Sequence, residues 1–111
     1  MGKGFSGIPG NMQAILKQAQ KLQEQMKKAQ QEAETYTEDA ASGGGMVKVV
    51  AGGKNRLMSI EIDKQVVNPD DIEMLQDLIL AACNEALQKV QQRVKAEMEK
   101  VTGGAPIPGM M

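Results

Sequence analysis

One stretch of the sequence decides the fold: MVKVVAGGKNRLMSIEID, residues 46–63. Residues 46–51 are apolar except for Lys48 and rich in β-branched side chains, and the following GGKN, residues 52–55, is typical of a turn. Apolar and polar residues then alternate over residues 56–63, as in a half-buried antiparallel strand. The apolar face of this strand is expected to carry Met58, Ile60 and Ile62. The pattern predicts a β-hairpin at the centre of a sheet.

A long helix is predicted before the hairpin, because residues 11–34 contain neither Gly nor Pro. Asn11 is the expected N-cap, since its side-chain oxygen can accept a free amide of the first turn. The apolar positions repeat in steps of three and four, which is a heptad pattern. They are Met12, Ile15, Ala19, Leu22, Met26, Ala29 and Ala33, with Tyr36 next in phase. A helix about 35 Å long with so narrow an apolar stripe needs another helix alongside it.

A second long helix is predicted after NPDD, residues 68–71, with Asn68 as its cap and Pro69 at its first position. Its apolar face is wide as far as Leu87 and narrow from there to Val101. We expect the wide part to pack on the sheet and the narrow part to project. Residues 35–40 are expected to add a third strand, because a lone hairpin is marginally stable in water.

The two ends of the chain are rich in Gly and Pro, and we expect them to lie outside the folded part. The predicted organisation is a flexible N-terminal arm over residues 1–10, a single domain over residues 11–101 and a flexible Gly/Pro/Met tail over residues 102–111. A domain of this size buries a modest core on its own, which favours oligomerisation.

The composition argues against catalysis and metal binding. The chain has no His and a single cysteine, Cys83, so a disulfide framework, a Cys/His zinc site and a usual nucleophile–base pair are all excluded. The glycine runs lack the spacing of a phosphate-binding loop. No signal peptide or membrane-spanning run is evident, and a cytoplasmic location is expected. We therefore expect a protein that is not an enzyme and uses no cofactor, metal, membrane or small-molecule substrate.

Charge is distributed in blocks although the net charge is only −1. Residues 1–28 carry five lysines and one glutamate, whereas residues 65–85 carry five acidic residues and no basic one. Lys17, Lys21 and Lys28 fall opposite the apolar stripe of the first helix, a face suited to phosphates or merely to solvent. With almost no aromatic residues for base stacking, contact with duplex DNA is favoured over single-strand recognition.

Several segments together resemble the YbaB/EbfC family of bacterial nucleoid-associated proteins. The resemblance runs nearly end to end and is carried by residues 17–26, 43–49, 59–63, 71–78 and 84–87, with the Gly/Pro/Met tail. It implies an α+β fold with an α-β-β-β-α protomer, in which a short antiparallel sheet is flanked by two long helices. It further implies a tweezer-like homodimer formed through the sheet, a place in the nucleoid, and DNA binding that alters the duplex and contributes to gene regulation.

The function predicted from these observations is largely sequence-nonspecific binding of duplex DNA. In the family the projecting helices are the suspected contacts, which here implies Lys17, Lys21, Lys27, Lys28, Lys89, Arg93, Lys95 and Lys100. Glu97 and Glu99 weaken this expectation for the second helix. The alternative is a protein-interaction module that uses the helical stripe and Met-rich ends, with DNA binding incidental.

Overall fold

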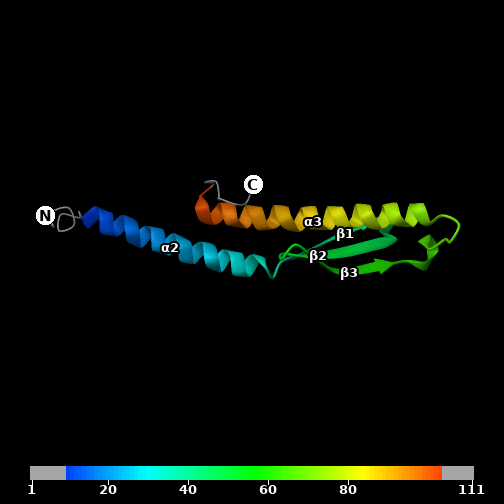
Figure 1. Ribbon diagram of the computed structural model, residues 1–111, viewed down its shortest axis with the longest axis horizontal. Helices are drawn as coiled ribbons and strands as arrows, with labels where there is room; N and C mark the ends of the chain where they lie inside the picture. The colour runs from blue at the N-terminus through cyan, green and yellow to red at the C-terminus, as the bar shows by residue number, and fades with distance from the viewer. Residues whose placement is uncertain (1–9, 104–111) are drawn as a thin grey trace.

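The computed structural model describes residues 10–103 and shows two long helices joined by a three-stranded sheet (Figure 1). The elements are α2 (Gly10–Ala33), β1 (Thr37–Ser42), β2 (Val47–Gly52), β3 (Arg56–Ile62) and α3 (Ile72–Thr102), with short 3-10 turns at Gly43–Gly45 and Lys64–Val66. The predicted α-β-β-β-α order is confirmed. Residues 1–9 of the expected arm and 104–111 of the expected tail lie outside the described residues.

The sheet is antiparallel, with strand order β1-β2-β3 and β2 at its centre. The predicted third strand is present as β1, displaced toward the hairpin by two residues. The alternation predicted for β3 is interrupted, because Met58 has no partner between Leu57 and Ser59, which lie opposite Ala51 and Val50. Such an extra residue shifts the alternation by one position. Leu57, not Met58, therefore shares a face with Ile60 and Ile62.

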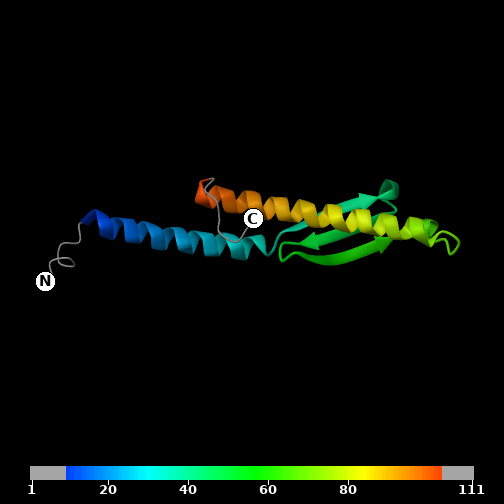
Figure 2. The same ribbon diagram turned by 45° about the horizontal axis from the view of Figure 1, so that its top comes forward.

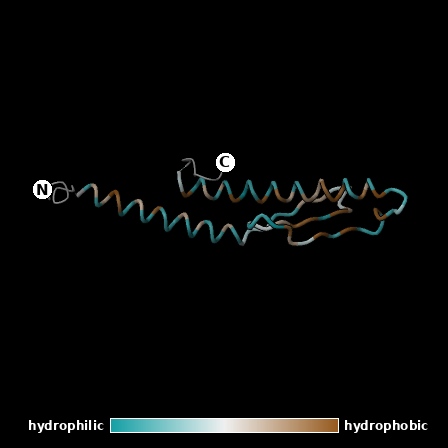
Figure 3. The backbone as a smooth tube through the Cα atoms, viewed as in Figure 1, coloured by the Kyte–Doolittle hydropathy of each residue, from teal (hydrophilic) through white to brown (hydrophobic). Residues whose placement is uncertain are grey.

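The core lies between one face of the sheet and α3. Val47, Val49 and Ala51 of β2 pack with Ala82, Ala86 and Val90 of α3, and each of the six is at most 1% exposed. The helix lies over β1 and β2 and barely contacts β3, all of whose residues are exposed (Figure 2). Figure 3 shows hydrophobic residues concentrated in β2, in β3 and in the part of α3 that lies over the sheet.

Helix α3 begins three residues later than the sequence suggests. Its N-cap is Asp71, whose carboxylate accepts the backbone amide of Met74 at 3.2 Å. Asn68, the predicted cap, instead accepts the amide of Asp70 at 2.9 Å within the preceding turn, so Pro69 lies in that turn. The prediction was wrong because Asn and Asp are equally good caps and only one of them meets an α3 amide.

Helix α2 begins at Gly10, so the predicted cap Asn11 is already within it, and it extends well beyond the end of α3 (Figure 1). The expected stripe is covered only near the C-terminal end of α2. Met26 and Ala29 are half-buried and Ala33 is 2% exposed, where α2 contacts α3. Residues 11–25 are exposed without exception. The N-terminal half of α2 therefore projects as a helix with both its apolar and its basic faces bare.

Candidate nucleic-acid interface

The elbow, residues 34–36 between α2 and β1, determines where the projecting helix points. The Tyr36 amide donates to the Ala33 carbonyl at 3.1 Å, and the Tyr36 carbonyl accepts the amide of Gly53 at 2.8 Å. Gly53 belongs to the β2–β3 turn, and a Cβ there would lie 1.7 Å from the Ala33 carbonyl oxygen. Only glycine permits so close an approach. The last turn of α2 is thus held directly against the sheet.

The four lysines predicted on the first helix all lie on α2 and are all exposed. They are Lys17, Lys21, Lys27 and Lys28. Within residues 10–103, none of the four has a hydrogen-bond or ion-pair partner. Their helical positions place Lys17 and Lys21 away from the side that contacts α3, whereas Lys28 lies at the edge of the groove between the two helices. This face is a row of unneutralised cations on a projecting helix.

Three of the four basic residues predicted on α3 have local partners instead. The Lys89 ammonium donates to the carbonyl of Asp39 in β1. Arg93 also reaches β1 and the elbow, and Lys100 forms an ion pair with Glu97 at 3.1 Å. Lys95 is exposed and makes no hydrogen bond or ion pair with residues 10–103. The structure therefore brings together free cations on α2 but uses much of the positive charge of α3 internally.

A groove of about 430 Å³ separates α2 from the C-terminal part of α3. Lys28 lines it from α2 and Lys100 from α3, and the carboxylates of Glu32 and Glu97 lie among them. The mixed charge favours water and ions over a single phosphate. A DNA backbone would meet the outer face of α2 more readily than this groove.

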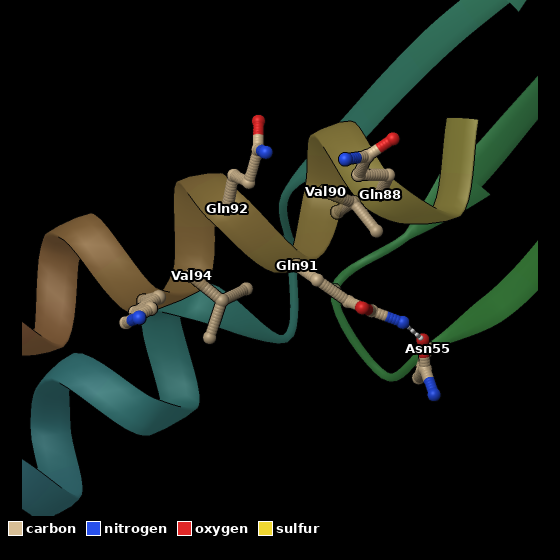
Figure 4. A pocket seen from close by; sticks show the side chains of 8 residues that line it. Asn55, Gln88, Val90, Gln91, Gln92 and Val94 are labelled. Carbon is tan, nitrogen blue, oxygen red and sulfur yellow. Dashed lines mark hydrogen bonds between the residues drawn. The ribbon is translucent and has the colours of Figure 1, made fainter. Parts of the chain in front are cut away.

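A second hollow, of about 410 Å³, lies between α3 and the β2–β3 turn (Figure 4). The Gln91 amide reaches from α3 to donate to the side-chain oxygen of Asn55 at 2.7 Å. Gln88 and Gln92 also line the hollow, and Val90 lies beneath them. This group of amides was not predicted from the sequence. The one local signal was GGKN, because Asn55 adopts a left-handed conformation, φ 65°, that asparagine tolerates well.

In the part of the chain that the structure describes, no group of three or more His, Cys, Asp or Glu side chains is placed to hold a metal ion. No helix in residues 10–103 combines the length and apolar character that crossing a membrane requires.

Comparisons with known proteins agree with the resemblance in the sequence. The sequence model of the YbaB/EbfC DNA-binding family matches residues 9–105. A nucleoid-associated protein of Clostridium novyi is 52% identical over 109 residues, and one of Acetivibrio thermocellus is 52% identical over 108; each alignment covers 96% of both chains. An uncharacterized protein from Helicobacter pylori, known from its crystal structure, has a similar fold: the TM-score is 0.68 at 21% identity, covering 86% of this chain and 99% of that one.

Proposed function

Because the chain belongs to the YbaB/EbfC DNA-binding family, we propose that it binds duplex DNA as a homodimer, largely without regard to sequence. The observation that carries the proposal is the row of four exposed, unpaired lysines on α2. Cations on a projecting helix can neutralise phosphates and release counterions, which drives sequence-independent binding.

The exposed strand β3 supports the dimer. Leu57, Ile60 and Ile62 share the face of the sheet that α3 covers elsewhere, yet they are 42%, 45% and 40% exposed. An apolar strip beside an open strand edge is typical of a surface that another chain covers. A second copy at β3 would cover both strips and join the two sheets. Each dimer would then present two lysine-bearing α2 helices.

Two such helices on one body would change the shape of the duplex. A duplex that follows both rows of lysines must bend or shift its groove width to keep its phosphates in contact. The protein would therefore act at the nucleoid, where nonspecific binding and deformation contribute to DNA organisation and to gene regulation. Binding needs no catalysis, and no cofactor or small-molecule substrate enters this proposal.

Paired charge reversals test the proposal. Lys17→Glu with Lys21→Glu places four acidic groups on the α2 helices of a dimer, and duplex affinity should fall by at least tenfold, since each lost phosphate contact weakens binding. The matched control is Lys54→Glu with Lys64→Glu, which makes the same charge change at exposed positions outside both helices. Fluorescence anisotropy with a labelled duplex measures both. Equal losses in the two variants would show that α2 is not the contact surface.

A protein-interaction module is the second candidate, and one observation favours it. The N-terminal half of α2 leaves Met12, Ile15, Leu16 and Leu22 exposed by 39% to 57%. Replacing Ile15 and Leu16 with Gln would abolish a function that depends on this stripe but would leave nonspecific DNA binding unchanged. Full duplex binding after this change, together with loss of function in the cell, would favour the second candidate.

A further inference from the structure

We propose that Arg93 is a positioning residue, which fixes the direction of α2 relative to α3, and that it makes no phosphate contact itself. The proposal rests on the proposed DNA-binding function, because it says how the lysines of α2 are held where a duplex can meet them. It assigns Arg93 a different role from the other basic residues of the two helices.

The contacts of Arg93 converge on the elbow and the start of β1. Its guanidinium carbon lies 4.0 Å from the centre of the Tyr36 ring, so the cation stacks on the ring face. One nitrogen of the same group lies 3.0 Å from a carboxylate oxygen of Glu38 and 3.4 Å from the carbonyl of Thr37. A planar guanidinium can stack and donate at once, whereas a lysine ammonium cannot reproduce both contacts. Arg93 thus ties α3 to the first residues after α2.

The contacts of Arg93 with Tyr36 and Glu38, here called the clamp, lie at the end of α2, where a small rotation moves the far end of the helix by a large distance. Ala33, the last residue of α2, and the Tyr36 carbonyl are held against Gly53, so the elbow is fixed to the sheet on one side and to α3 on the other. Helix α2 has 24 residues and is about 36 Å long. A rotation of about 10° at the elbow would move its far end by about 6 Å, more than the 3.4 Å rise of one base pair. Loosening the clamp would therefore misplace the α2 lysines against the phosphates.

The direction in which one substitution changes duplex affinity distinguishes a positioning role for Arg93 from a phosphate contact. Glu38→Ala removes an acid and frees Arg93. If Arg93 bound phosphate, this change would strengthen duplex binding, whereas a broken clamp weakens it. We expect affinity to fall about three- to tenfold, from the size of an exposed cation–π and ion-pair cluster. Arg93→Lys keeps the charge, so it would preserve a phosphate contact but should weaken the clamp by a similar factor.

The salt dependence of binding gives an independent readout. Loss of a phosphate contact lowers the slope of log affinity against log salt by about 0.9 for each phosphate, whereas a misplaced helix lowers affinity through the population of competent molecules. We expect Arg93→Gln to bind duplex DNA more weakly, with a salt slope that stays within about 0.5 of the wild-type slope. This margin is about half the slope that one phosphate contact contributes. A slope that drops by one or more contacts per protomer would overturn the proposal.

The direction of α2 can be measured without DNA. Spin labels at Gln13→Cys on α2 and Ala96→Cys on α3, in a Cys83→Ser background, report the distance between the helices by electron–electron double resonance. Labelled protein is mixed with excess unlabelled protein, so that only distances within one chain contribute. We expect a narrow distribution for the parent and a broad one for Arg93→Gln and for Tyr36→Leu, which removes the ring without changing charge.

These results decide between the alternatives. Unchanged distributions in both clamp variants, or a gain of affinity in Glu38→Ala, would overturn the proposal. If the parent protein fails to bind duplex DNA at all, the proposed function fails, while the distance distributions still decide whether the clamp exists. Circular dichroism of each variant confirms that the folded protein is being compared.

Discussion

Because the exposed strand β3 lies in the proposed dimer interface, Ile60→Lys should dissociate the proposed dimer. Ile60 is 45% exposed, and full burial of an isoleucine side chain is worth about 1.5–3 kcal/mol. Covering its exposed half therefore contributes about 0.7–1.4 kcal/mol in each protomer and, by twofold symmetry, about 1.4–2.8 kcal/mol in the dimer. That is roughly a ten- to hundredfold change in Kd, before the added cost of burying the ammonium group.

Sedimentation across a protein concentration series measures this change directly. The matched control is Ser59→Lys, because Ser59 lies opposite Val50 on the other face of the same strand. We expect the control to dissociate like wild type and Ile60→Lys to dissociate at least tenfold more readily, since only the latter places a charge in the covered strip. An unchanged Kd for Ile60→Lys would refute the assignment. Dissociation by Ser59→Lys alone would place the interface on the opposite face.

Two further predictions concern the positioning of the helices. Gly53→Ala should lower the free energy of unfolding by about 3 kcal/mol or more, because the added Cβ overlaps the Ala33 carbonyl. Its control, Gly103→Ala, adds a Cβ in open space and should cost about 1 kcal/mol through backbone strain alone. Urea denaturation at one protein concentration compares the two variants, and equal losses of stability would argue against the close contact at Gly53. Asp71→Ala should cost about 1 kcal/mol through loss of the α3 cap, and Asn68→Ala should cost less because its bond lies in a turn; the reverse order in the same assay would restore Asn68 as the cap.

Local patterning explains why the element order could be predicted from the sequence. The spacing of apolar residues marks both long helices, and glycines follow the ends of β1, β2 and α3. The interruption of β3 could not be predicted, because RLMSIEI has apolar side chains at both Leu57 and Met58, and pairing with β2 decides which one shares a face with Ile60. The cap of α3 was ambiguous for a similar reason.

The candidate interface was predictable only in part. Helical spacing alone places Lys17, Lys21 and Lys28 on one face of α2, and the structure leaves all three exposed. The surroundings of Arg93 could not be inferred, since its partner Glu38 is 55 positions away in the chain. Such long-range contacts depend on how α3 crosses the sheet, which periodicity does not specify.

A salt titration of duplex binding is the most direct test of the claim that α2 is the DNA-binding element. If all four α2 lysines of both protomers contact phosphate, the slope of log affinity against log salt should approach about −7, from about 0.9 per contact. Replacing Lys17 and Lys21 with Ala removes four of these cations from the dimer and should make the slope shallower by about 3 to 4. An affinity that does not change with salt, or a slope that this double replacement leaves unchanged, would contradict the account.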